Sequence, residues 1–130
     1  MNTHLNAREI LYQNLPYDMQ WSDKSFLCTL HDDRKLNLTS YWQLEWAVLQ
    51  LTTDQIDYPR HLSCSVFQVF ICAASLLYDH TNPDDDYEIK DVSRSVVHQL
   101  RQRTEAVFEG FFKGRHADMR AFKEINPLLD

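Results

Sequence analysis

The densest group of chemically active side chains in this sequence is the segment "DHTNPDDDYEIKD" at residues 79–91. Six carboxylates fall within its thirteen residues, against a single lysine, Lys90. Like charges held this close repel one another, and the docking of a cationic partner offsets that repulsion. Tyrosine is a favoured interface anchor, and Tyr87 lies in the same segment. The candidate partner-binding residues are therefore Asp84, Asp85, Asp86, Tyr87, Glu88 and Asp91.

A simpler interpretation of the acidic segment needs no partner. It would be a solvated loop whose carboxylates favour the positive N-terminal end of the following helix. The residues alone leave both interpretations open. A second acidic pair, Asp32 and Asp33, is a weaker candidate for the same binding role.

Metal and cofactor sites are not expected. Asn82, Asp84 and Asp86 have the first spacings of a calcium loop, but Tyr87 stands where the loop needs glycine. Ser93 likewise stands where a bidentate glutamate is needed. The sequence has neither Cys-x-x-Cys nor His-Glu-x-x-His, and its six histidines are scattered.

Catalysis is not expected either. A nucleophile needs an adjacent base, and the sequence has no Gly-x-Ser-x-Gly motif. Cys64 and Cys72 lie in an apolar segment, where a thiol is normally inert. Two glycines in the whole chain cannot build a phosphate-binding loop. A small enzyme of unrecognised type is the least favoured alternative.

Composition favours one all-α domain over residues 1–130, because tight turns use glycine and glycine is scarce here. The net charge of −6 argues against direct nucleic-acid binding. That charge is uneven: residues 1–91 carry −8 and residues 92–130 carry +2. Three free cysteines and the lack of a visible secretory signal predict a cytoplasmic protein.

Apolar periodicity predicts a bundle of five to six helices. We expect helices at 3–14, at 40–51 with Ser40 and Gln43 as a capping box, at about 59–78, from Asp91 or Ser93 to Lys113, and at 116–125. Residues 22–31 are ambiguous, because Phe26, Cys28 and Leu30 alternate as in a strand, so a short hairpin near 24–38 is an alternative. The helix at 59–78 is apolar nearly all round. It is expected at the centre of the bundle and not in a membrane.

Both glycines lie in "VFEGFFKG" at residues 107–114. Glycine inside a helix costs about 1 kcal/mol relative to alanine, so Gly110 predicts the close approach of a neighbour or a bend. The helix containing Trp42 and Trp46 is the expected neighbour. Gly114 should end the helix in a left-handed turn.

The order "YDHTNPDDDYEIKDVS" followed by a helix ending in "VFEGFFKG" resembles a family of bacterial immunity proteins. These are partners of polymorphic toxins, such as those of contact-dependent growth inhibition, and the nearest group is immunity protein 41. The resemblance covers roughly residues 78–114. The tripled aspartate Asp84–Asp86 exceeds the acidic content of the family pattern.

The resemblance implies an inhibitor that binds the C-terminal domain of a cognate toxin in the cytoplasm and masks its active site or an essential surface. Such toxins are commonly basic nucleases, for example tRNases, which an acidic inhibitor would complement. The main alternative is a helical adaptor or regulatory module that binds through an exposed part of its aromatic surface.

Overall fold

The computed structural model describes residues 6–52, 58–90 and 92–129, and within them the fold is all-α. The helices are α1 (Ala7–Gln13), α2 (Phe26–Asp32), α3 (Leu38–Leu51), α4 (Arg60–Thr81) and α5 (Arg94–Lys113). A short 3₁₀ turn, η1 (Met119–Ala121), follows α5. The expected all-α single bundle is confirmed.

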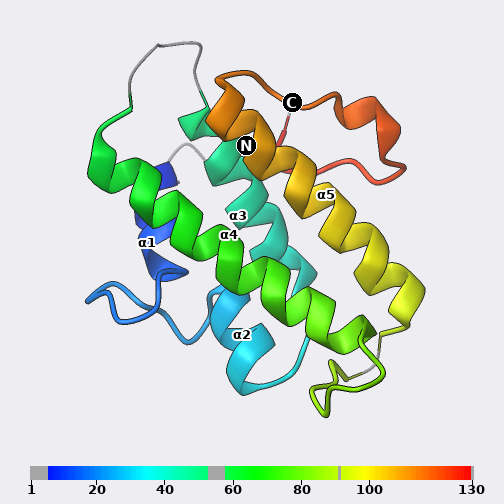
Figure 1. The fold of residues 1–130 in the computed structure, drawn as a ribbon. Coiled ribbons are helices and arrows are strands. Elements are labelled where there is room, and N and C mark those ends of the chain that lie inside the picture. The colour runs from blue at the N-terminus through cyan, green and yellow to red at the C-terminus, as the bar shows by residue number, and fades with distance from the viewer. Residues whose placement is uncertain (1–5, 53–57, 91, 130) are drawn as a thin grey trace.

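The two longest helices, α4 and α5, lie side by side and antiparallel, with α1, α2 and α3 behind α4 (Figure 1). Phe70 of α4 packs against Phe108 of α5 with ring centroids 5.3 Å apart. One continuous core joins the five helices. Its fully buried side chains include Leu11, Phe26, Tyr41, Leu44, Val48, Val66, Val69, Leu77, Val97 and Phe111.

The ambiguous segment is a helix, not half of a hairpin. Ser25 caps α2 by accepting a hydrogen bond from the backbone N–H of Cys28, and residues 26–30 are all buried. A short helix that is buried on every side has no polar face, so its sequence shows no helical period. In the expected hairpin region, Lys35 instead forms an isolated bridge with Lys90.

Two of the expected helix starts differ from the structure, and a third agrees with it. Asn37, not Ser40, caps α3, and Ser40 lies in its first turn, where its N–H donates to Asn37 Oδ1. The first helix begins at Ala7 with Asn6 as its cap, while positions 3–5 of the expected helix lie outside the described residues. Ser93 caps α5 as expected.

The expected helix at 116–125 is wrong. Only η1 is helical; its Met119 packs against the core, but Ile125 is 81 % exposed. Polar contacts also hold this segment. Arg103 Nη1 donates to the carbonyl of Glu124, and Asn126 Nδ2 donates to the carbonyl of Trp42.

The expected position of α4 is also wrong. Its buried residues form a single stripe, and 28 % of its most apolar 18-residue window is buried. Phe67, Ile71 and Tyr78 are 52 %, 43 % and 51 % exposed. Thus α4 lies on the outside of the bundle, although its length and composition would also allow it to cross a membrane.

Gly110 is buried, but α3 is not what crowds it. A Cβ at this position would lie 2.6 Å from the carbonyl oxygen of Arg115 and 3.1 Å from the amide nitrogen of Ala117. The chain folds back over its own helix here. Gly114 makes that reversal with a φ of 73°, which confirms the left-handed helix end.

Candidate functional site: the acidic loop after α4

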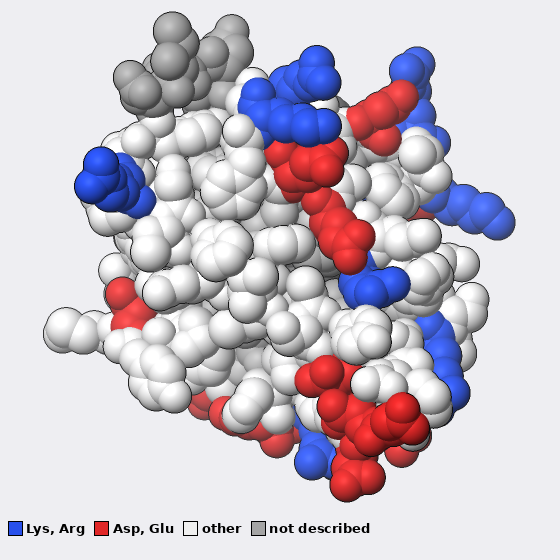
Figure 2. All heavy atoms as spheres, in the orientation of Figure 1, with Lys and Arg blue, Asp and Glu red and all other residues white. Residues whose placement is uncertain are grey.

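The acidic loop, residues 82–90, joins the C-terminal end of α4 to the start of α5. Asp84, Asp85, Asp86 and Glu88 are all exposed. In Figure 2 they belong to the red cluster at the lower right, where Figure 1 shows this loop. Asp91 lies outside the described residues, so five of the six predicted binding residues can be placed.

Two of the loop's own polar side chains fix its turn. Asn82 Oδ1 accepts a hydrogen bond from the N–H of Asp84 at 3.1 Å, and Asp85 Oδ1 accepts one from the N–H of Tyr87 at 2.8 Å. Asparagine and aspartate commonly form such turns because their short side chains mimic a backbone carbonyl. One carboxylate oxygen of Asp85 is therefore used inside the loop. The side chains of Asp84, Asp86 and Glu88 are exposed.

The end of the loop is tied to the body of the protein. The N–H of buried Ile89 donates to His80 Nδ1 at 2.8 Å, and the N–H of Lys90 donates to the carbonyl of Arg34 at 2.7 Å. His80 belongs to the last turn of α4, and Arg34 follows α2. These two contacts attach the C-terminal end of the loop to α4 and to the segment after α2.

Tyr87 provides a third contact with α2. Its ring is half-buried against the core, and its hydroxyl donates to the carbonyl oxygen of Leu30. The guanidinium of Arg34 lies 5.6 Å from the ring centroid. Burial raises the pKa of Tyr87 to about 12. Because the hydroxyl already has an internal acceptor, this residue positions the loop as well as contributing to its surface.

A hollow of about 350 Å³ lies beside the loop. At the end of α4, burial and then the nearby charge of Asp85 raise the pKa of Asp79. Within the described part of the chain, no ion pair neutralises Asp84, Asp85, Asp86 or Glu88. Three carboxylates and one cation, Arg94, line the hollow. Its walls are His80, Asn82, Asp85, Asp86, Tyr87, Glu88, Val92 and Arg94.

His80 is the residue of this site that sequence reasoning left unassigned. It is 6 % exposed, and burial lowers its pKa, an effect that the nearby charge of Glu88 opposes and that of Arg94 reinforces. Because Nδ1 accepts a hydrogen bond, the neutral ring carries its proton on Nε2. The available signal was its place in the quoted "YDHTNPDDDYE" pattern, which did not reveal what the ring contacts.

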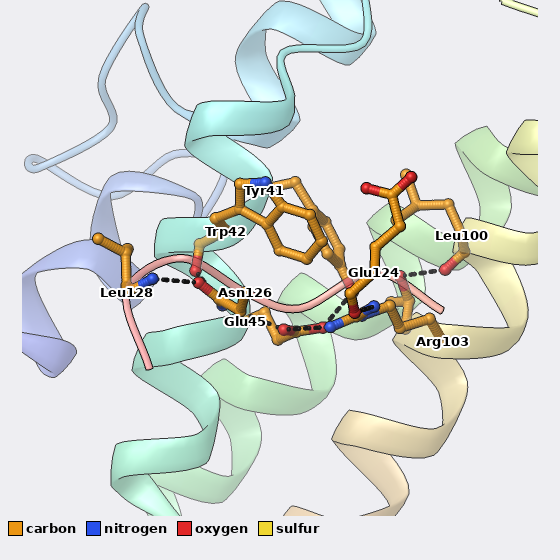
Figure 3. A network of polar contacts seen from close by, with 9 residues as sticks. Tyr41, Trp42, Glu45, Leu100, Arg103, Glu124, Asn126 and Leu128 are labelled. Atoms are coloured by element: carbon orange, nitrogen blue, oxygen red, sulfur yellow. Dashed lines mark hydrogen bonds and ion pairs between the residues drawn. The ribbon is translucent and has the colours of Figure 1, made fainter. Parts of the chain in front are cut away.

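A second polar cluster, also not anticipated, holds the C-terminal segment against α3 and α5 (Figure 3). Arg103 forms a two-pronged ion pair with Glu45, with Nε–Oε1 and Nη2–Oε2 distances of 2.5 and 3.0 Å. Tyr41 and Asn126 also donate to the Glu45 carboxylate. Both charged side chains are buried and each has several partners, so the arrangement is that of a structural clamp.

A third group of chemically active residues, Cys28, His31 and Asp32, meets on α2. Among the described residues, no group of three or more His, Cys, Asp or Glu side chains could hold a metal ion. Asp32 accepts a hydrogen bond from the Cys28 thiol at 3.2 Å, and its other oxygen lies 2.6 Å from His31 Nδ1. Burial, together with Asp32, raises the pKa of Cys28 to about 11, so this thiol is protonated at neutral pH. Asp33 is exposed at the end of α2.

Comparison of the chain with protein-family models, with curated proteins and with solved structures found no match. The function therefore has to be argued from the acidic loop and from the motif resemblance alone.

Proposed function

We propose that this protein is an immunity protein that binds and neutralises the C-terminal domain of a cognate bacterial toxin. The toxin domain would be basic, as in a nuclease such as a tRNase. The inhibitor would act in the cytoplasm, without catalysis or a cofactor, by masking the active site or an essential surface. The resemblance of residues 78–114 to immunity proteins motivates this proposal.

The observation that carries the proposal is a fixed loop with exposed, uncompensated carboxylates. Ordering a mobile acidic loop on binding would cost conformational entropy, but the contacts of His80 and Tyr87 already hold this loop. Arginine and lysine side chains of a partner would complete charge-assisted hydrogen bonds to it. Complementary charge of this kind accelerates association and selects the correct partner.

The residues have different parts in the proposal. Asp84, Asp86 and Glu88 meet the partner directly, since their carboxylates are exposed and make no internal ion pair. Asp85 contributes charge while it also holds the turn. Tyr87 presents only part of its ring and mainly positions the loop. Asp91 stays in the proposed site on sequence grounds alone.

The test is co-expression with the polypeptide encoded immediately upstream, followed by capture and a growth-rescue assay. The variant carries Asp84→Asn, Asp85→Asn and Asp86→Asn together. Asparagine at position 85 keeps a side-chain oxygen that can accept from Tyr87, so the turn should survive. A matched control removes three exposed acids elsewhere, through Glu9→Gln, Asp23→Asn and Glu105→Gln.

The proposal expects the wild-type protein and the control to capture a toxin domain and rescue growth, and the loop variant to lose both activities. If all three proteins capture the toxin domain equally well, the immunity function is supported, but the binding site does not lie in the acidic loop. If the upstream polypeptide is neither toxic nor captured, the immunity function fails, and a helical adaptor becomes the better hypothesis.

A further inference from the structure

The outer face of α4 is an uncharged apolar strip on the surface of the protein. Two polar residues of this helix, His61 and Gln68, are exposed beside it, and the strip itself consists of five exposed positions: Cys64, Phe67, Ile71, Ser75 and Tyr78. No Asp, Glu, Lys or Arg occurs between Arg60 and Asp79. In Figure 2 this strip is the broad white area over α4. Exposed apolar surface of this kind commonly marks an interaction site.

The spacing of these five positions is symmetrical about Ile71. Phe67 and Ser75 each lie four residues from Ile71, and Cys64 and Tyr78 each lie seven residues from it. A second α4 laid antiparallel across Ile71 therefore places Phe67 opposite Ser75 and Tyr78 opposite Cys64. Each bulky ring then meets a small side chain, which is the shape complementarity that close helix packing needs.

The two ends of the strip carry opposite charge. At the N-terminal end of α4, exposed Arg60 lies near the end of α5, since Tyr58 stacks on Phe111 with ring centroids 4.3 Å apart. That end of α5 carries Lys113, which is ion-paired with Glu109 at 3.0 Å, and exposed Arg115 follows the helix. At the other end stands the acidic loop. Figure 2 shows blue side chains towards the first end and the red cluster at the second.

We propose that α4 is the interface of a symmetrical homodimer, in which two copies of this chain pack α4 against α4 antiparallel with the twofold axis near Ile71. In that register position 60 of one copy lies opposite position 82 of the other. Each basic end therefore meets an acidic loop, and the contact forms twice because the interface is isologous. This inference is independent of the proposed function.

A second copy fits these observations better than a lipid bilayer does. Clustered carboxylates at one end of the strip oppose contact with an anionic membrane surface, whereas they complement the basic end of another copy. Beside the strip, the guanidinium of Arg101 on α5 lies 5.6 Å from the centroid of the Tyr78 ring, and it would form part of a polar rim. One helix pair is a small interface, so we expect a dissociation constant of roughly micromolar size.

Light scattering coupled to size-exclusion chromatography, over a series of protein concentrations, tests the dimer. The wild-type protein should shift from monomer to dimer as its concentration rises, and Ile71→Glu should weaken the dimer at least tenfold. Val96→Glu is the matched control, since Val96 is 48 % exposed on α5 and lies outside the strip. A wild-type monomer at all concentrations, or equal dimerisation of both variants, would overturn the proposal.

Cross-linking tests the register without a charged substitution. In a chain with Cys64→Ser and Cys72→Ser, Ile71→Cys should form a disulfide-linked dimer on mild oxidation, because equivalent residues meet at a twofold axis. Val96→Cys in the same background should remain monomeric. Co-flotation of the wild-type protein with vesicles of phosphatidylcholine and phosphatidylglycerol, with no cross-linking through position 71, would assign the strip to lipid and overturn the dimer.

Discussion

At the scale of single residues, two groups of charged side chains contrast, one paired inside the protein and one left to solvent. Glu45 is 1 % exposed and Arg103 is 5 % exposed, and each has several hydrogen-bonding partners. Asp84, Asp86 and Glu88 have no ion-pair partner among the described residues. The first group governs stability, and the second is free to govern binding.

Removing one member of the buried Glu45–Arg103 ion pair should lower the free energy of unfolding more than replacing both members does. Arg103→Met leaves the Glu45 carboxylate buried without its cation, and we expect it to reduce the free energy of unfolding by about 3–5 kcal/mol. Adding Glu45→Leu should recover a substantial part of that loss. Urea denaturation of the three proteins is the measurement. A double variant no more stable than the single one would contradict the account.

Gly110→Ala should destabilise the protein, although alanine is the better helix former by about 1 kcal/mol. The new methyl group would lie 2.6 Å from the backbone oxygen of Arg115, and such overpacking typically costs about 1–3 kcal/mol. Gly110→Leu should cost more. Thermal melting shows whether Gly110→Ala lowers or raises the stability. Glu105→Ala, at an exposed position of the same helix, is the control for the helix propensity of alanine. If Gly110→Ala stabilised the protein, the backbone of residues 115–117 would have moved to make room for the methyl group, and the prediction would be wrong.

At the scale of elements, the sequence predicted best the segments that have a regular apolar face or a recognisable end. The course of α5 from the Ser93 cap to Gly114 follows from local chemistry. Burial on every side of α2 left no period to detect, and the C-terminal segment is held by Arg103 and Asn126 from elsewhere in the chain. Such contacts between distant residues have no signature in a single sequence.

The candidate site was predictable in charge but not in shape. The run of acids at residues 84–88 was evident from composition. Its attachment through His80 to Ile89, and through Tyr87 to Leu30, joins residues up to 57 positions apart and needed the fold. The outward position of α4 was missed for a related reason, because an apolar helix looks the same in sequence whether the protein buries it or not.

The attachment of the acidic loop should depend on pH through His80. Burial lowers the pKa of this residue below its ordinary value of 6.5, so the folded protein binds fewer protons than the unfolded chain between the two values. The free energy of unfolding should therefore fall as the pH drops below 6.5, by up to about 1.4 kcal/mol per pH unit, until the folded-state pKa is passed. A protonated ring would also lose its acceptor for Ile89.

Urea denaturation between about pH 7.5 and pH 5.5 measures this dependence. His80→Gln keeps an acceptor oxygen for the Ile89 N–H but does not titrate, so it should show a flatter profile than the wild-type protein. Identical slopes for the two proteins would exclude His80 as the titrating group.

At the scale of the whole molecule, charge is separated along α4. The acidic loop stands at one end, and Arg60, Lys113 and Arg115 stand near the other. An electric field of this kind would orient a basic partner such as the proposed toxin domain. The same separation supports the antiparallel homodimer, whose formation would compete with a toxin for the loop.

The most direct test of the central claim is the rate of association with the captured toxin domain, measured over a range of salt concentrations. Replacing Asp84, Asp85 and Asp86 with asparagine should slow association at least about tenfold at low salt and flatten its salt dependence, whereas the Glu9, Asp23 and Glu105 control should behave as the wild-type protein. Association that is equally fast and equally salt-dependent in all three proteins would contradict a binding site at the acidic loop.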